Sequence, residues 1–221
     1  MSIPAGDGSK RPYDARRRRE RADEERRATR RRVVDAASRA FVANGYTATT
    51  MADIAREAGV AVQSVYTAAQ SKADLLHLVV DLAVAGDDED VLVHDRQAYA
   101  EIAAEPDAER QVQMIAGLIC SIQERSAPVQ AAYREAAAVD PKVAASLEAA
   151  HRRRHESFTV AIRMLPAHRL RRSPEESTDT MWAIGSSEVF LLLRTVRGWD
   201  ASHYREWLTR TLVDQLLLPG D

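Results

Sequence analysis

Aromatic residues, cysteines and long apolar runs are all scarce in this chain. Aromatics account for 5% of its 221 residues, and Cys120 is the single cysteine. One cysteine excludes an intramolecular disulfide and is typical of a reducing compartment. No apolar run is long enough to cross a bilayer, and no signal-peptide segment follows Met1. We therefore expect a cytoplasmic protein without a membrane anchor.

The chain is instead rich in alanine and arginine. Hydrophobic residues make up 45% of the sequence and charged residues 29%, enough for a buried core and a solvated surface. Alanine and arginine favour helices, whereas the shortage of aromatics argues against sheets. No stretch shows the apolar alternation of a strand. The sequence predicts an all-α protein.

The net charge of −2 conceals two segments of opposite sign. Residues 10–32 hold twelve Lys or Arg and five Asp or Glu, a surplus of seven positive charges. Residues 81–109 hold ten acidic residues and one Arg. A basic segment of this kind is either an ordinary solvated surface or a contact for an anionic polymer such as DNA.

Two short helices are predicted in the stretch TTMADIAREAGVAVQSVY, residues 49–66. Thr50 and Asp53 have the spacing of a capping box, and Gly59 suits a turn that requires a positive φ. Ile54 and Val65 then point to a shared core. Because isolated helices of this length are unstable in water, they must pack on neighbours. The pattern predicts a helix-turn-helix, whose second helix can enter the major groove of DNA.

Start and stop signals organise the rest of the chain. We predict a helix over residues 28–44 before the motif and a helix from Ser71 to Gly86 after it. Pro128 and the Asp140-Pro141 pair are read as later helix starts. Ser173 should open a helix that runs to residue 197, and Asp200 should cap a final helix that ends near Leu218. We expect a disordered basic arm at residues 1–25, a helix-turn-helix DNA-binding domain at residues 26–86, and a larger helical-bundle domain for ligand binding and dimerisation at residues 87–221.

Residues 32–78 combine several short motifs at a specific and uninterrupted spacing. They are Ala36-Ala37, Ala40-Phe41, Asn44-Gly45-Tyr46, Thr49-Thr50, Ile54-Ala55, Ala58-Gly59-Val60, Val65-Tyr66, Ser71-Lys72 and Leu75-Leu76. In this combination the stretch resembles the N-terminal domain of the tetracycline-repressor-like (TetR) family. The resemblance implies a homodimeric repressor that binds a double-stranded DNA operator and is released by a small molecule in the larger domain. No cofactor is implied.

The DNA-binding residues are expected on and around the second helix of the motif. By the family pattern, Thr50, Tyr66 and Lys72 contact phosphates. Gln63 can bond adenine, Ser64 can bond several bases, and Val62 can meet a thymine methyl group. Thr67 shares the outward face, and neither Gln63 nor Lys72 is expected in the core. The chain departs from the family at Ala61, where a polar cap is usual, at Val62, and at Ala68-Ala69, which replace a His-Phe pair.

The larger domain is expected to hold the effector between its helices. Bulky candidates for the cavity wall, each of which can also be ordinary core, are Met114, Tyr133, Phe158, Met164, Trp182 and Phe190. Two apolar stripes near the C-terminus are predicted to pair across a twofold axis or, alternatively, to face the chain's own core. The first stripe is Val189, Leu192 and Val196, and the second is Tyr204, Leu208, Leu212 and Leu216.

Two other functions remain open at this stage. The regulator could respond to a protein partner rather than to a small molecule. A helical metal-dependent enzyme could use His151, His155 and Glu156, because H-x-x-x-H places two imidazoles on one helical face. Three arginines lie between the two histidines, so a solvated basic face is the better interpretation, and we expect neither a metal site nor catalysis.

Overall fold

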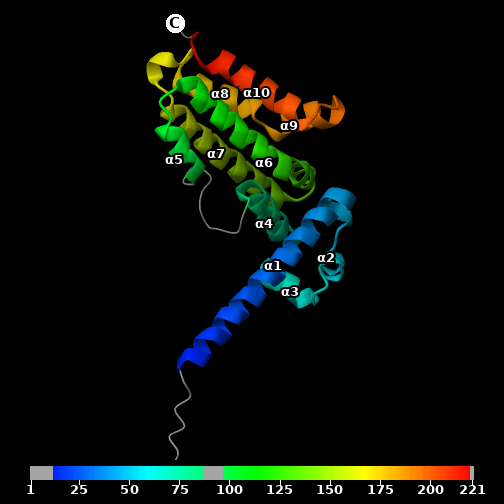
Figure 1. The fold of residues 1–221 in the computed structure, drawn as a ribbon. Helices are drawn as coiled ribbons and strands as arrows, with labels where there is room; N and C mark the ends of the chain where they lie inside the picture. The colour runs from blue at the N-terminus through cyan, green and yellow to red at the C-terminus, as the bar shows by residue number, and fades with distance from the viewer. Residues whose placement is uncertain (1–11, 87–96, 220–221) are drawn as a thin grey trace, which may run out of the picture.

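The structure, a computed structural model, describes residues 12–86 and 97–219, which form a helical head and a larger helical body (Figure 1). The head contains α1 (Pro12–Ala48), α2 (Met51–Ala58), α3 (Val62–Ala68) and α4 (Lys72–Ala85). The body contains α5 (Gln97–Ala104), α6 (Ala108–Ala137), α7 (Pro141–Met164), α8 (Pro174–Ile184), α9 (Ser187–Leu191) and α10 (Ala201–Leu216). A 3₁₀ turn (Ala167–Arg169) and a π turn (Leu192–Val196) complete it.

The all-α prediction is confirmed. Within the described residues, the one β-type contact is an isolated bridge between Leu170 and Leu217. None of the described helices combines the length and the apolar character that crossing a bilayer requires.

Two hydrophobic clusters hold the molecule together. The first joins α1 to α4 with the C-terminal part of α6 and the start of α7, through residues such as Val129, Tyr133 and Val143. The second lies inside the body and joins α5, α6, α7, α8, α9 and α10. The head therefore completes its core on α6 rather than within residues 26–86 alone. The predicted start of the larger domain falls in residues 87–96, which lie outside the described part of the chain.

The prediction of a disordered arm is wrong for residues 12–25, which form the first turns of α1. Extending an existing helix avoids the cost of nucleation, and arginine, glutamate and alanine favour the extension. A pair at helical spacing supports it, with Arg16 Nε 2.9 Å from Glu20 Oε1. The remainder of the predicted arm, residues 1–11, is outside the described residues.

Helix starts follow the local cap signals closely. Thr50 and Asp53 form the complete capping box, and Gly59 ends α2 with a φ of 65°. The side chains of Ser71, Asp140, Ser173 and Asp200 accept hydrogen bonds from the first backbone amides of α4, α7, α8 and α10. These contacts span at most three residues, so the sequence alone was sufficient to predict them.

Two predicted boundaries are wrong. Pro128 does not start a helix; it lies exposed inside α6, which continues because residues on both sides of it are buried. The helix from Ser173 does not reach residue 197, because it ends at Gly185 and Ser186 caps a new helix by accepting from Val189 N. The carbonyl of Gly185 accepts a 2.8 Å bond from buried Gln123, which fixes the break against α6.

Gly185 offers a direct test of this packing. A Cβ at this position would lie 2.9 Å from Met181 O and 3.3 Å from the Ile119 side chain. We expect Gly185→Ala to lower the free energy of unfolding by ~1–3 kcal/mol through overpacking. The control is Gly117→Ala in α6, where no atom lies within 4 Å of the added Cβ, so helix propensity should make that variant slightly more stable. Urea unfolding of both variants measures the difference; equal behaviour would contradict the packing argument.

The C-terminal stripes separate into one buried and one exposed set. Tyr204, Leu208, Leu212 and Leu216 are at most 1% exposed and belong to the core of the body. The prediction that this stripe forms a dimer interface is therefore wrong, because these side chains pack within their own chain. On the other stripe, Leu192 is 54% and Val196 74% exposed.

Candidate DNA interface and ligand cavity

The helix-turn-helix is built on a small buried contact. Ile54 and Ala55 of α2 and Val65 of α3 are buried in the first hydrophobic cluster. The turn between the helices is closed by Gly59 N donating to Arg56 O and by Val60 N donating to Ala55 O at 3.0 Å. Val65 is the one buried residue of α3, so the remaining side chains of this helix extend toward the surface.

The predicted recognition residues share this outer surface. Val62 and Tyr66 are 42% and 46% exposed, Gln63 and Thr67 are also exposed, and Ser64 is half-buried. Thr67 Oγ1 donates to Gln63 O at 2.9 Å, so the hydroxyl of Thr67 already has a partner within the helix. Ala61 at the N-cap makes no side-chain bond, as expected from its missing hydroxyl. The first turn of α3 therefore presents backbone N–H groups without a side-chain cap.

Lys72 has a structural role that the sequence did not indicate. Its Nζ donates to Tyr46 O at 2.8 Å and to Thr49 O at 3.0 Å, and lies 4.2 Å from the centre of the Tyr46 ring. The side chain thus satisfies carbonyl groups near the end of α1. Lys72 is half-buried and lies outside the core, as expected, but its replacement would disturb the head as well as any phosphate contact. Thr50 is exposed at the N-terminus of α2, where its hydroxyl donates to Asp53 Oδ2 at 2.5 Å.

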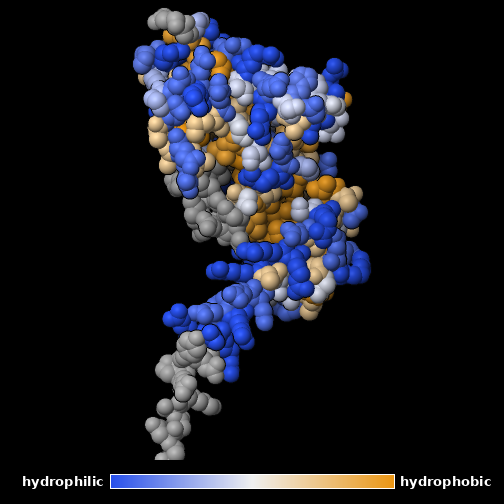
Figure 2. All heavy atoms as spheres, in the orientation of Figure 1, coloured by the Kyte–Doolittle hydropathy of each residue, from blue (hydrophilic) through white to orange (hydrophobic). Residues whose placement is uncertain are grey.

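The arginine-rich start of α1 extends past the rest of the head. Figure 1 shows the N-terminal half of α1 and helix α3 at the same end of the molecule, and Figure 2 shows hydrophilic residues along that part of α1. Arg16, Arg17, Arg18 and Arg19 are all exposed there. The basic segment and the recognition helix therefore belong to one end of the protein.

Polar contacts tie the head to the body. Tyr46 Oη donates to Asp140 Oδ2 at 2.6 Å, and burial together with this bond raises the pKa of Tyr46. Lys142 Nζ lies 2.8 Å from Asp74 of α4, and this contact lowers the pKa of the Asp74 carboxyl. Arg125 of α6 donates to the carbonyl groups of Ala83 and Val84 at the end of α4. Sequence patterns could not reveal these contacts, since the partners lie 41 to 94 residues apart.

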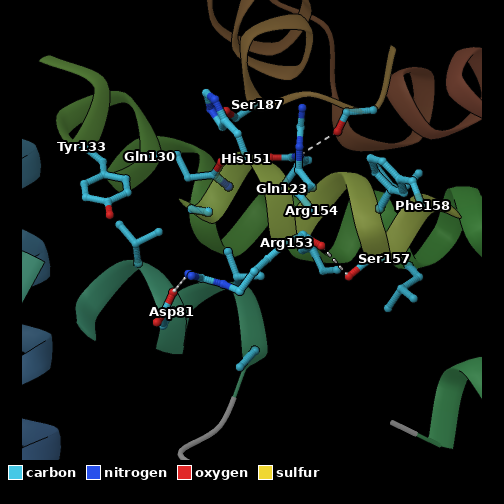
Figure 3. Close-up of a pocket in the computed structure, with 18 of the residues that line it drawn as sticks. Asp81, Gln123, Gln130, Tyr133, His151, Arg153, Arg154, Ser157, Phe158 and Ser187 are labelled. Atoms are coloured by element: carbon cyan, nitrogen blue, oxygen red, sulfur yellow. Dashed lines mark hydrogen bonds and ion pairs between the residues drawn. The ribbon is translucent and has the colours of Figure 1, made fainter. Parts of the chain in front are cut away.

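A cavity of about 690 Å³ lies between α4, α6, α7 and the α8–α9 turn (Figure 3). This volume is typical of pockets that hold drug-sized molecules. Figure 2 shows apolar surface in the notch between head and body. Tyr133 and Phe158 line the cavity as predicted. Met114, Met164, Trp182 and Phe190 do not line it but pack in or against the core of the body, so their assignment to this wall is wrong.

Charged residues from α1, α4, α6, α7 and α9 line the same cavity. Arg153 of α7 contacts Asp81 of α4 at 3.3 Å, and His77 Nε2 lies 3.1 Å from the same carboxylate. Arg134 of α6 lies 3.3 Å from Glu188 of α9. Arg154 also lines the cavity, on the side of α8 and α9 (Figure 3). In the sequence, Arg153 and Arg154 are simply members of a basic run. Nothing there distinguishes the arginines exposed to solvent from Arg154, which the fold encloses.

The two histidines of the H-x-x-x-H pattern both meet the Trp182 ring edge-on, His151 at 6.0 Å and His155 at 6.4 Å. His155 Nε2 also lies 2.9 Å from Asp179 Oδ1. Burial, followed by the charge of Arg154, lowers the pKa of His151. The neutral form of His151 is therefore favoured at its position on the cavity wall.

Several solved structures share this fold across most of their length. NalD, the secondary repressor of the MexAB-OprM multidrug efflux pump in Pseudomonas aeruginosa, is 19% identical, with a TM-score of 0.66 over 88% of this chain and 98% of NalD. A transcriptional regulator from Saccharomonospora viridis in complex with choline is 19% identical, with a TM-score of 0.64 over 86% and 98% of the two chains. SmeT in complex with triclosan is 17% identical, with a TM-score of 0.64 over 87% and 93%. At these identities the likeness establishes the fold.

In sequence, the match to a known family lies in the head. No curated protein matches the chain. Residues 33–79, which run from the buried stripe of α1 through the helix-turn-helix into α4, match the profile of the bacterial regulatory proteins of the tetR family. The resemblance noted in the sequence is thereby confirmed, together with the DNA-binding regulatory function that it implied. Through this match, residues 33–79 carry the N-terminal domain of the tetR family of bacterial regulatory proteins.

Proposed function

We propose that this regulator is a homodimeric repressor, which a small molecule in the α4–α6–α7 cavity releases from a near-palindromic operator. The observation that carries the proposal is the double role of α4. Leu75, Leu76 and Val79 belong to the core of the head, while Leu78, Asp81 and Leu82 of the same helix line the cavity. A ligand that displaces one face of α4 therefore acts on a helix that packs on α1, which in turn contacts the recognition helix α3.

The physical requirement is a difference in affinity between two states. A ligand shifts an equilibrium only if it binds one arrangement of the heads more tightly than the other. The Asp81–Arg153 and Asp74–Lys142 contacts join α4 to α7 on the cavity side and the head side. We infer that ligand binding alters these contacts and favours a spacing of the two heads that does not match the operator.

We assign a separate function to each of the two domains. We assign DNA binding to residues 26–86, whose helix α4 also lines the cavity, and the rest of ligand binding together with dimerisation to residues 87–221, with the head resting on α6. Two proteins of the same fold hold choline and triclosan in their structures, which supports a ligand-binding body. For the dimer, we propose the exposed stripe of Leu192 and Val196 together with half-buried Val189.

Control by a protein partner is the competing mechanism. It requires no small molecule in the cavity, so a thermal-shift screen of the purified protein against metabolites and drugs separates the two. Stabilisation by a compound that also lowers DNA affinity supports ligand control.

The contacts to DNA divide into two kinds. We assign base reading to Gln63, Ser64 and Val62, which lie in the first turn of α3, and backbone contacts to Thr50, Tyr66 and Lys72. Thr67 borders the same surface. Because a dimer is twofold, the half-sites should be centred about one helical turn of DNA, or a multiple of it, apart.

The experiment that tests this proposal is selection of bound sequences from random DNA, followed by affinity measurements on operator and scrambled DNA at one salt concentration. Gln63→Ala should lose ~1–3 kcal/mol of discrimination if Gln63 makes a bidentate base contact. Gln113→Ala, an exposed glutamine on α6, serves as the matched control and should change neither affinity. If Gln63→Ala lowers both affinities equally, base reading lies elsewhere on α3. Failure of the parent to enrich any sequence would rule out the repressor.

A further inference from the structure

Arg154 is a largely enclosed cation at the wall of the cavity. Its guanidinium lies 4.8 Å from the centre of the Trp182 ring and 5.7 Å from that of Phe158, and Nη2 donates to Trp182 O at 3.0 Å. Its Nε is buried and has no hydrogen-bond partner among the described residues. Burial lowers the pKa of Arg154 to about 10, so the group remains charged at pH 7.

Of the three carboxylates that line the cavity, Glu156 is exposed, and Glu188 and Asp81 contact other bases. Glu188 is 3.3 Å from Arg134 and also accepts from Ser187 Oγ at 3.2 Å. Asp81 contacts Arg153 and His77 on the α4 side of the cavity. Within the described parts of the chain, no carboxylate lies within 4.0 Å of Arg154. Because a buried unpaired charge is costly, this end of the cavity favours an anion.

Gln123 provides a second unpaired group at the same end. It is 3% exposed and lines the cavity from α6. Its Nε2 donates to Gly185 O at 2.8 Å, but Oε1 is buried without a partner among the described residues. Arg154 and Gln123 bond to the carbonyl groups of Trp182 and Gly185, which lie three residues apart at the end of α8, and Figure 3 shows the two side chains close together. At this end of the cavity, the Arg154 guanidinium therefore lacks an anion and Gln123 Oε1 lacks a hydrogen-bond donor.

The rest of the wall is mainly aliphatic. It includes side chains from α4, α6 and α7, namely Leu78, Leu82, Leu118, Ile122, Leu147 and Ala150. We propose that the effector is an amphipathic organic acid: its carboxylate pairs with Arg154, an adjacent N–H or O–H donates to Gln123 Oε1, and its apolar body lies along these side chains. This inference rests on the proposed ligand control of the regulator and specifies the chemical class of the ligand.

Three matched probes test the two polar contacts without changing the protein. N-decanoylglycine has the carboxylate, the adjacent N–H and an apolar chain. In N-decanoylglycinamide a neutral amide replaces the carboxylate, and in N-decanoylsarcosine a methyl group replaces the N–H. We expect calorimetry with the full-length protein to show binding of N-decanoylglycine, weakened roughly 10- to 100-fold for the glycinamide and roughly tenfold for the sarcosine. Decyltrimethylammonium, a cation, should bind more weakly than N-decanoylglycine.

Substitutions then locate the charge contact. Arg154→Met should reduce affinity for N-decanoylglycine by the same factor as replacement of the carboxylate, while leaving affinity for N-decanoylglycinamide unchanged. Arg152→Met is the matched control on α7, because Arg152 is exposed, lies outside this cavity and contacts Glu148 at 2.9 Å. Circular dichroism checks the fold of both variants. If Arg154→Met does not fold, the affinities of the unmodified protein for the probes still show whether the carboxylate contributes to binding.

The inference is overturned if N-decanoylglycine does not bind, if the three probes bind equally, or if the glycinamide or the cation binds more tightly. These measurements contain no DNA. A protein that selects an operator but ignores N-decanoylglycine therefore contradicts only this inference. A protein that binds the probe as expected but selects no DNA contradicts the proposed repressor function instead.

Discussion

Leu208→Arg is expected to abolish cooperative folding of the body. Leu208 is fully buried in the core of the body, on the face that α10 turns toward the other helices. An arginine there loses its hydration without gaining a partner, at a cost of several kcal/mol. Because the whole stability of a domain is only ~5–15 kcal/mol, a single substitution of this kind is sufficient. Thermal melts followed by circular dichroism should show a broad transition or aggregation.

The matched substitution is Val196→Arg, on the proposed dimer surface. Val196 is 74% exposed, so its replacement should change the free energy of unfolding by no more than ~0.5 kcal/mol. If Leu192 and Val196 meet their twofold copies, the new like charges should produce a folded monomer, which light scattering detects. A Val196→Arg protein that remains dimeric places the interface elsewhere. If the unmodified protein is monomeric at micromolar concentration, the proposed homodimer is wrong.

The second large effect concerns the arginines at the start of α1. An α-helix is ~10–12 Å wide and the minor groove of DNA is ~6 Å wide, so this helical segment fits along phosphates rather than inside that groove. Replacing Arg16, Arg17, Arg18 and Arg19 with glutamine retains a helix-forming sequence and removes four charges. We expect affinity to fall roughly tenfold or more. The slope of log affinity against log salt should decrease by ~0.9 for each phosphate that the variant no longer neutralises.

A charge-matched control separates local contact from net charge. Arg152, Arg163, Arg172 and Arg210 are exposed arginines of the body, and changing all four to glutamine alters the net charge by the same amount. That variant should retain the slope of the parent. Operator preference should survive in both variants, because phosphates carry no sequence information. Unchanged slopes in the α1 variant would show that the arginines do not contact DNA.

The sequence was most informative where an interaction closes within a few residues. The capping box of Thr50 and Asp53, the positive φ of Gly59 and the cap of Asp200 depend on neighbours one helical turn away, and all are present. The same holds for the family assignment, because the spacing of the motifs is itself local. Exposure of Gln63 and burial of Val65 also followed from the helical period, since opposite faces of a seven-residue helix are only two residues apart in the chain.

Tertiary structure decided whatever depends on residues distant in the chain. Tyr204 and Leu208 form an apolar stripe that a partner subunit or the same chain could cover, and only their packing in the core of the body distinguishes the two. Lys72 is an ordinary surface lysine by pattern until the fold places carbonyl groups of Tyr46 and Thr49 beside it. Arg154 differs from Arg152 only by the side of α7 on which it lies, and therefore by which helices enclose it. Periodicity shows that a residue belongs to a face, but the burial and charge of that face are set by elements that the chain brings together from elsewhere.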